Sequence, residues 1–234
     1  MNIRAGIDLG SRFIKVAIES GGDVGEVSNI SLHSVSTIDF YKLRAKLIRD
    51  GVSNIEKALL SYLSIPQGAA ILATGYGRNV LQMDNISTIS EIKAHFYGVK
   101  RQLKGLNSEE QNSFTILDVG GQDCKVINVK GGYIDDFVMN DKCAASTGRF
   151  VENAATALGM TLGSFSSAVN GPITLPSTCA VFCESELIGL LAQGANEETL
   201  AASVNCSIAK RLSAMISRYK PSVIITASRL ARNS

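Results

Sequence analysis

The sequence predicts a duplicated α/β fold with two similar lobes, and two observations support this prediction. First, the motif D-[L/V]-G-x4-K-V occurs twice, beginning at Asp8 and at Asp118. Second, each copy opens a stretch that reads as three strands followed by helices. A single Asp-x-Gly hairpin is common by chance, but two copies that open the same series of elements favour a true duplication. We expect a first lobe over residues 1–110 and a second lobe over residues 111–234.

The first half begins as a β-meander, because apolar and β-branched runs alternate with short turns, the first of them at Gly10-Ser11. Apolar residues then recur at helical intervals, with Gly51 as a break and Ser90 as the N-cap of a later helix. The predicted elements, in order, are strands at about 3–10, 12–20 and 25–36, helices within 40–62, a strand at 69–78 that runs into a glycine turn, and a helix over 90–103.

The second half repeats this programme, because it again starts with three apolar runs separated by glycine turns. The predicted elements are strands at 113–121, 123–130 and 131–140, helices from about 144 to 158, from about 177 onward and from about 200 to 219, and a late strand at 221–228. This layout predicts two α/β lobes related by a pseudo-twofold axis, with a cleft between them.

Composition and charge exclude several classes of protein. The 234 residues are 45% hydrophobic and 19% charged, which is ordinary for a soluble globular protein. A net charge of +2 gives no electrostatic basis for binding nucleic acid or a membrane surface. The N-terminus lacks the apolar run of a signal peptide, and no stretch approaches the roughly 18 apolar residues of a membrane helix. We therefore expect a cytoplasmic protein whose five cysteines stay reduced, for metal, redox or packing roles.

The repeated motif suits the binding of a metal-chelated polyphosphate. A strand that ends in Asp-[Leu/Val]-Gly and turns back directly places a carboxylate and several backbone N–H groups at the tip of a hairpin. Glycine lets the main chain approach a bulky anion, lysine adds positive charge, and aspartate holds Mg²⁺ through water. Two such hairpins would hold a nucleotide triphosphate from both sides. The pair resembles the phosphate-binding motifs of the actin and sugar-kinase superfamily, which implies an actin-like (ribonuclease H-like) ATPase fold with a nucleotide cleft.

Two cysteines lie next to predicted helix starts. Cys143 precedes the helix expected from about residue 144, and Cys179 lies in the first turn of the helix expected near Ser177. The helix dipole and free N–H groups at such a point favour a thiolate or an anionic iron–sulfur cluster. Two cysteines from each of two chains would complete a four-cysteine site, whereas buried and inert cysteines are the usual alternative.

Six motifs carry a closer resemblance: GIDLGS, TGYGR, EIKAHFYG, LDVGGQDCKVI, NDKCAASTGRF and STCAVFCESE. With them the sequence resembles, over nearly its whole length, the activator components of 2-hydroxyacyl-CoA dehydratases and the related ATPase subunits of benzoyl-CoA reductases. The resemblance implies a homodimer with one [4Fe–4S] cluster between its subunits, held by Cys143 and Cys179 of each. It also implies that ATP hydrolysis drives transfer of a low-potential electron, supplied by reduced ferredoxin or flavodoxin, to a dehydratase or a benzoyl-CoA reductase-like partner.

The resemblance assigns roles to the residues of both turns. Asp8 and Asp118 are the carboxylates on the Mg²⁺ side, Lys15 adds positive charge, and Gln122 orients the attacking water. The residues whose backbone faces the phosphates are Gly10, Ser11, Gly120 and Gly121.

Other roles leave alternatives open. Gly148, Arg149 and Glu152 border the nucleoside, with a helix-surface role as the alternative for the last two. Glu91 either assists the attacking water or is a solvated acid at a helix start, and Cys183 is either a fifth thiol near the cluster or a packing residue. The residues to which the sequence assigns no site role are His33, His95, Cys124 and Cys206.

The sequence departs from the family pattern in two places. Ser146 replaces a small glycine, which is a tolerable change. Ala227 and Ser228 stand where the family has a glycine pair that contacts the adenosine, and a closing C-terminal segment is missing, which predicts a truncated or diverged chain. Two other functions therefore stay open. One is a regulatory or scaffold paralogue that does not hydrolyse ATP, and the other is a small-molecule kinase of the same fold.

Overall fold

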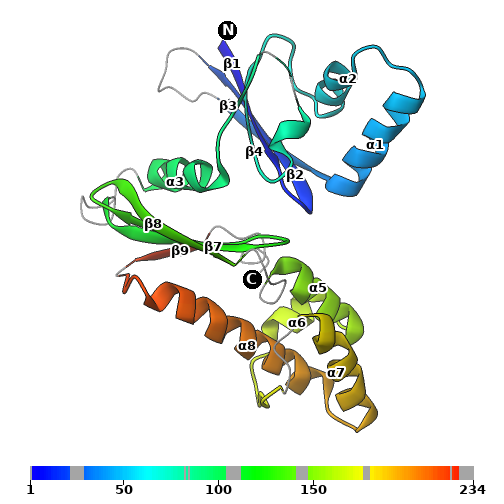
Figure 1. Ribbon diagram of the computed structural model, residues 1–234, viewed down its shortest axis with the longest axis vertical. Helices are drawn as coiled ribbons and strands as arrows, with labels where there is room; N and C mark the ends of the chain where they lie inside the picture. Colours follow the sequence, from blue (N-terminus) through cyan, green and yellow to red (C-terminus); the bar gives the residue numbers. More distant parts are fainter. Residues whose placement is uncertain are drawn as a thin grey trace. The chain divides into compact units, whose positions relative to one another are not determined.

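The computed structural model describes residues 2–21, 29–81, 83, 85–103, 112–140, 147–175, 180–221 and 223–226 (Figure 1). It forms two compact units, Met1–Ala94 (unit 1) and His95–Ser234 (unit 2), and each has its own sheet. None of the helices in this described part of the chain combines the length and the apolar character needed to cross a lipid bilayer.

Unit 1 contains a five-stranded sheet with the strand order β3-β2-β1-β4-β5. The strands are β1 (Asn2–Leu9), β2 (Phe13–Gly21), β3 (Asn29–Ser36), β4 (Ala70–Thr74) and β5 (Ile86–Thr88). The helices are α1 (Thr37–Arg49), α2 (Ile55–Tyr62), the short 3₁₀ turn η1 (Arg78–Val80) and the start of α3 (Glu91–Gln102). The central strand β1 pairs antiparallel with β2 and parallel with β4.

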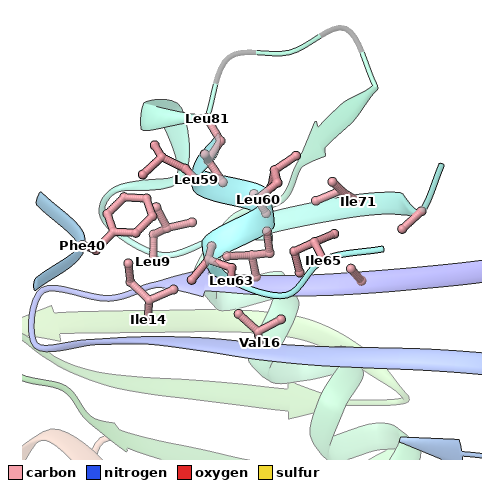
Figure 2. Packing of buried hydrophobic residues seen from close by; sticks show 14 residues of the cluster. Leu9, Ile14, Val16, Phe40, Leu59, Leu60, Leu63, Ile65, Ile71 and Leu81 are labelled. Atoms are coloured by element: carbon pink, nitrogen blue, oxygen red, sulfur yellow. The ribbon is translucent and has the colours of Figure 1, made fainter. Parts of the chain in front are cut away.

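The core of unit 1 follows from the alternation of apolar residues along β1 and β2. Ile7 and Leu9 on β1 and Ile14 on β2 are almost wholly buried on one face of the sheet. Helices α1 and α2 cover that face, and Figure 2 shows Phe40 of α1 and Leu59 of α2 packed against it. Because strand side chains alternate between faces, residues between these positions project from the opposite face. The polar residues of the repeated motif therefore stay out of this core.

Unit 2 contains a four-stranded sheet with the order β8-β7-β6-β9, which repeats the order of the first four strands of unit 1. The strands are β6 (Phe114–Val119), β7 (Cys124–Lys130), β8 (Tyr133–Asn140) and β9 (Ile224–Thr226). Again the central strand, here β6, pairs antiparallel with the next strand and parallel with a later one. This match confirms the duplicated α/β fold that the sequence predicts.

The helices of unit 2 form a second core. They are α5 (Gly148–Ala157), α6 (Leu162–Ser167), α7 (Ala180–Ala192) and α8 (Glu197–Ser217). Phe150 of α5, Phe165 of α6, Leu187 of α7 and Leu200 of α8 are buried together. Side chains cap three of these helices: Thr147, Thr161 and Asn196 each accept a hydrogen bond from a first-turn N–H group.

Most predicted elements are confirmed, with shifted ends. The helical stretch over 40–62 is two helices separated at Gly51, and Ser90 accepts a hydrogen bond from the backbone N–H of Lys93, as expected of an N-cap. The short elements β5, η1 and α6 were not predicted. The predicted third strand is shorter than expected, since β3 begins at Asn29.

Candidate functional site

The turns of the two repeats match in their backbone hydrogen bonds. In unit 1 the Gly10 N–H donates to the Phe13 carbonyl at 3.1 Å, and in unit 2 the Gly120 N–H donates to the Asp123 carbonyl at 2.8 Å. A Cβ atom at Gly10 would lie 2.9 Å from the Phe13 carbonyl oxygen, and one at Gly120 would lie 3.0 Å from that of Asp123. Both positions therefore require glycine because the turn closes tightly on itself.

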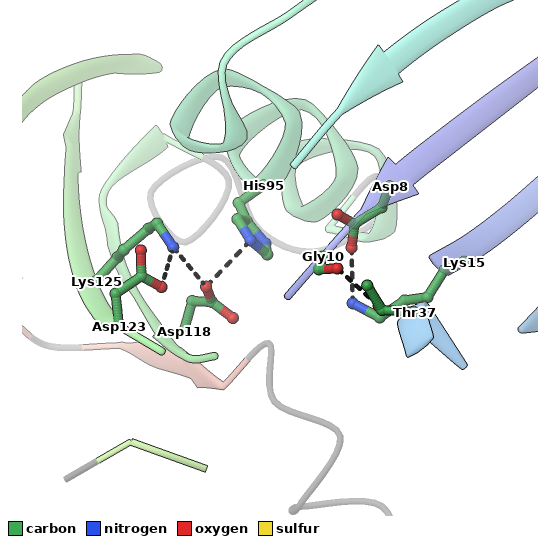
Figure 3. Close-up of polar contacts among 8 residues, drawn as sticks. All are labelled: Asp8, Gly10, Lys15, Thr37, His95, Asp118, Asp123 and Lys125. Atoms are coloured by element: carbon green, nitrogen blue, oxygen red, sulfur yellow. Dashed lines mark hydrogen bonds and ion pairs between the residues drawn. The ribbon is translucent and has the colours of Figure 1, made fainter. Parts of the chain in front are cut away.

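Each turn carries an Asp–Lys pair that the strand register sets. Asp8 lies directly opposite Lys15 in the β1–β2 pair, and Asp118 lies directly opposite Lys125 in the β6–β7 pair. Opposite residues of an antiparallel pair share one face of the sheet, so their side chains meet. Lys15 Nζ lies 2.7 Å from Asp8 Oδ2, and the lysine side chain is 57% exposed (Figure 3).

The Asp118–Lys125 pair in unit 2 is buried, and two further side chains contact it. The Lys125 side chain is 2% exposed, and its Nζ lies 2.6 Å from Asp123 Oδ1 and 3.6 Å from Asp118 Oδ2. His95 of α3 also reaches this oxygen, with Nε2 at 3.3 Å from Asp118 Oδ2 (Figure 3). Two carboxylates share one lysine, so with a neutral imidazole the four side chains carry one net negative charge. Such a site favours a cation next to Asp118.

The start of α5 holds the turn of unit 2. The Gly148 N–H donates to the Gly120 carbonyl at 2.8 Å, and the Arg149 N–H donates to the Gly121 carbonyl at 3.1 Å. The described peptide bonds are trans, and in a trans peptide the carbonyl and the following N–H point in opposite directions. The N–H groups of Gly121 and Gln122 therefore point away from α5. Two successive N–H groups with a common direction form a nest for an anion.

In unit 1 the start of α1 holds the β1–β2 turn in a similar way. Thr37 donates from Oγ1 to the Gly10 carbonyl at 2.9 Å, and its N–H donates to the Arg12 carbonyl at 3.3 Å. By the same stereochemistry, the Ser11 N–H points away from Thr37. In both units, carbonyls of the turn are bonded to the next helix, so the turn presents the Ser11 N–H in unit 1 and the Gly121 and Gln122 N–H groups in unit 2 on its other side.

One sequence expectation is corrected at α5. The sequence suggested that free N–H groups at this helix start would donate to an anionic group held by Cys143. The first three N–H groups of α5 already donate, those of Gly148 and Arg149 to the turn and that of Phe150 to the Thr147 hydroxyl. This helix start therefore favours a nearby anion through its dipole rather than through free donors.

The loop after β4 passes close to the carboxylate of unit 1. Gly75 has φ +94°, and a Cβ there would lie 2.5 Å from the Leu9 carbonyl oxygen and 2.7 Å from Asp8 Oδ1. The preceding residue, Thr74, lies opposite Asp8 in the parallel β1–β4 register. Its Oγ1 is buried without a hydrogen-bond partner among the residues that the structure describes. A buried hydroxyl in this state is suited to a bound water or ligand oxygen.

Replacing Gly75 by alanine is expected to destabilise the protein by about 3–5 kcal/mol, because the new methyl group meets both backbone and carboxylate oxygens. Gly68 is the matched control, since it also has a positive φ of +80° but nothing within 4 Å of its Cβ position. Gly68→Ala is expected to cost about 1–2 kcal/mol from backbone strain alone. Urea unfolding of both variants measures the difference, and equal losses would contradict the close packing at Gly75.

The residues predicted to bind nucleotide fall into two groups. Unit 1 brings together Asp8, Gly10, Ser11 and Lys15 at the β1–β2 turn. Unit 2 brings together Asp118, Gly120, Gly121 and Gln122 at the β6–β7 turn, with Gly148 and Arg149 bonded to it and Glu152 farther along α5. Glu91 is the first residue of α3. The predicted cluster ligands Cys143 and Cys179, and the substituted positions Ser146, Ala227 and Ser228, lie outside the described residues.

Two of the other cysteines belong to hydrophobic cores. Cys124 on β7 is 0% exposed, and Cys183 on α7 is 2% exposed within the helical core of unit 2. Burial raises the pKa of the Cys124 thiol to about 12, and the carboxylates of Asp118 and Asp123 add to the effect. The Cys124 thiol therefore stays protonated at neutral pH, which makes it inert as a nucleophile or metal ligand.

The raised pKa of Cys124 predicts a loss of stability in alkali. The thiol ionises near pH 9.0 in the unfolded chain but only near 12 in the fold, so its contribution is complete below pH 9 and is lost above it. Between these values the free energy of unfolding falls by about 1.4 kcal/mol per pH unit from this group. Urea unfolding at pH 8–10.5 is expected to show a shallower pH dependence for Cys124→Ala than for wild type. Parallel curves would contradict the assignment.

Several residues of the site were not predicted from the sequence. The motif T-x-x-F occurs at Thr37–Phe40 and again at Thr147–Phe150, with the same spacing as the two aspartates. This second repeat would have identified the threonines that begin α1 and α5. For His95 the available signal was weaker: Glu91 and His95 are four residues apart and thus share a helix face.

The donor groups fit a magnesium ion held mainly through water. In the part of the chain that the structure describes, no three His, Cys, Asp or Glu side chains come together as a ready-made metal site. Mg²⁺ typically keeps several waters and binds one or two carboxylates together with substrate phosphates. Asp118 in its negatively charged surroundings and Asp8 beside the unsatisfied Thr74 hydroxyl supply carboxylates of this kind.

Comparison with known proteins agrees with these features. The BadF/BadG/BcrA/BcrD ATPase family matches residues 5–226. The chain is 32% identical over 238 residues to the 2-hydroxyisocaproyl-CoA dehydratase activator of Clostridioides difficile, a match that covers 98% of this chain and 81% of that protein.

Two solved structures share the fold. The crystal structure of Acidaminococcus fermentans (R)-2-hydroxyglutaryl-CoA dehydratase component A matches with a TM-score of 0.73 and 30% identity, covering 100% of this chain and 85% of that one. The Clostridium difficile activator of 2-hydroxyisocaproyl-CoA dehydratase with bound ADPNP matches with a TM-score of 0.72 and 30% identity, covering 99% and 82%. These matches confirm the predicted actin-like ATPase fold. The chain belongs to the BadF/BadG/BcrA/BcrD ATPase family.

Proposed function

We propose that the chain is an ATP-dependent activator that passes a low-potential electron to a 2-hydroxyacyl-CoA dehydratase. One observation carries this proposal: the same Asp–Lys turn, with the same closing hydrogen bond, occurs in both units of a chain whose relatives are named as activators of such dehydratases. Each turn offers an acid, a lysine and outward N–H groups, which together suit Mg²⁺ and phosphate. A small-molecule kinase of the same fold would need, in addition to these turns, a pocket for its second substrate and a general base to activate it.

In this proposal the turns bind the phosphates of ATP and the aspartates hold Mg²⁺ through water. Asp8 serves from unit 1 and Asp118 from unit 2, while Lys15 adds positive charge. Gln122, exposed at the tip of the second turn, orients the attacking water because its amide both donates and accepts. Gly148, Arg149 and Glu152 border the nucleoside. With this arrangement the chain positions the reacting groups and stabilises charge, which is how proteins accelerate phosphoryl transfer.

We further propose that Cys143 and Cys179 of two copies hold one [4Fe–4S] cluster, which makes the active form a homodimer. Helices α5 and α7, which follow these cysteines in sequence, pack in one core, and this supports a common site. The burial of Cys124 and Cys183 leaves few other thiols for it. Such a cluster, when bound, would supply one-electron chemistry between reduced ferredoxin or flavodoxin and the dehydratase.

The test is activation of a purified 2-hydroxyacyl-CoA dehydratase by the anaerobically purified chain. The dehydratase of the Clostridioides difficile system is a suitable partner, because the activator of that system is a relative. We expect dehydration only when ATP, Mg²⁺ and a low-potential reductant are all present, with ATP hydrolysed to ADP. Iron-free protein that phosphorylates a small molecule would support a kinase instead. Iron-loaded protein without ATP turnover would support a scaffold.

A further inference from the structure

The two repeats differ in how their aspartates are held. In unit 1, Lys15 contacts Asp8 at 2.7 Å, and the residue at the end of the turn is the uncharged Phe13. In unit 2, the equivalent of Phe13 is Asp123, whose Oδ1 accepts a hydrogen bond from Lys125 Nζ at 2.6 Å. Lys125 is left 3.6 Å from Asp118, beyond hydrogen-bonding distance. The lysine of the second repeat therefore lies farther from its aspartate than the lysine of the first repeat does.

His95 takes the place of that contact. Its Nε2 lies 3.3 Å from Asp118 Oδ2, closer than Lys125, and the two side chains are only 26% and 10% exposed. An imidazole with a proton on Nε2 donates to this oxygen whether or not the ring is charged. Partial burial strengthens such a contact relative to the exposed pair of unit 1.

Helix α3 is itself fixed in unit 2, so His95 is not a loosely placed side chain. Phe96 and Val99 of α3 are buried. Lys100 donates from Nζ to the Gly132 carbonyl at 3.0 Å in the β7–β8 turn, and its ammonium lies 5.9 Å from the centre of the Tyr133 ring. A residue on an anchored helix holds its partner more firmly than a residue on a loop.

We propose that His95 is the positioning residue of Asp118. It holds Oδ2 and so orients the carboxylate before the metal–nucleotide complex arrives, just as the 2.7 Å contact from Lys15 holds Asp8 Oδ2 in the other repeat. This inference rests on the proposed function, because it assigns Asp118 to the Mg²⁺ side of the nucleotide. Partners of direct metal ligands typically contribute 10–100-fold in metal affinity, and since Asp118 acts through water, an effect at the lower end of that range, about 10-fold, is expected.

The experiment measures Mn²⁺ binding in the presence of ADPNP, a nucleotide that is not hydrolysed, with free Mn²⁺ followed by electron paramagnetic resonance. His95→Ala is expected to weaken Mn²⁺ binding by about 10-fold. His95→Gln keeps an N–H donor and is expected to restore affinity to within about threefold of wild type. His33→Ala is the matched control, since His33 is exposed on β3 in unit 1, and should bind as wild type.

Asp118→Asn separates failure of this inference from failure of the proposed function. If Asp118→Asn loses Mn²⁺ and His95→Ala binds as wild type, the positioning role of His95 is wrong while the proposed metal site stands. If Asp118→Asn itself binds as wild type, the proposed metal site is wrong. Should His95→Ala be unstable by thermal unfolding, the glutamine variant decides: a loss as large as that of alanine contradicts positioning through an N–H donor.

Discussion

Asp118→Asn is expected to lower the rate of ATP hydrolysis by about 100-fold or more, because it removes a carboxylate that we propose lies on the Mg²⁺ side of the phosphates. The change keeps the shape of the side chain. It also leaves Lys125 paired with Asp123 at 2.6 Å, so the buried ammonium keeps a partner and the fold is expected to persist. The measurement is phosphate release at saturating ATP over a range of Mg²⁺ concentrations.

The matched control for this substitution is Asp136→Asn on β8. Asp136 pairs with Arg218 at 3.1 Å and accepts a hydrogen bond from Tyr219, and it lies opposite Asn128, several residues along β7 from the β6–β7 turn. An exposed pair of this kind contributes about 0–1 kcal/mol, so Asp136→Asn should hydrolyse ATP like wild type. Asp8→Asn is expected to resemble Asp118→Asn. Full activity in both turn variants would remove the basis for assigning the repeated motif to the nucleotide.

The repeat made much of the fold predictable from sequence. A D-x-G turn between two apolar strands is a local structure, and its register follows from the position of the turn. The sequence therefore placed the aspartate and the lysine of each copy in one hairpin, and the structure adds that Asp8 lies opposite Lys15 and Asp118 opposite Lys125. The closing hydrogen bond is also the same in both turns, because each turn requires glycine where a Cβ would meet the carbonyl oxygen three residues farther along the chain.

The sequence could not predict contacts between elements that are distant along the chain. His95 meets Asp118 only because α3 packs against the second sheet, and nothing local to either residue signals that contact. The bonds from the start of α5 to the carbonyls of Gly120 and Gly121 are of the same kind. Short elements were also missed, because strand β5 and helix α6 have too few residues for a periodic pattern.

The sequence also could not predict that the lysines of the two turns differ in burial. Lys15 and Lys125 occupy the same position in the motif, yet the first side chain is 57% exposed and the second 2%. The cause is Asp123, one residue that differs between the repeats, which gives the second lysine a partner and makes its burial tolerable. A duplicated motif thus predicts common geometry, while the single substitutions within it decide how each copy is used.

Cys143→Ser is expected to remove iron from the protein. A four-iron cluster shared by two chains gives about two iron atoms per chain. Because the substitution is present in both chains of the dimer, it removes two of the four thiolates. A hydroxyl of similar size does not supply the thiolate that iron requires, so iron should fall to near zero and dehydratase activation should cease. Iron and sulfide are quantified after anaerobic purification, with the spectrum of the reduced protein as a second measure.

Three companions make the result specific to the proposed ligands. Cys179→Ser should lose iron to the same extent, whereas Cys206→Ser, on helix α8, should keep it. ADPNP binding by Cys143→Ser should match wild type, because the substitution leaves the closing backbone hydrogen bonds of both proposed nucleotide-binding turns in place. A variant that keeps its nucleotide affinity but has no iron has lost a ligand rather than its fold. Brown, iron-loaded Cys143→Ser would instead assign the cluster to other thiols, and the homodimer that depends on shared ligands would lose its basis.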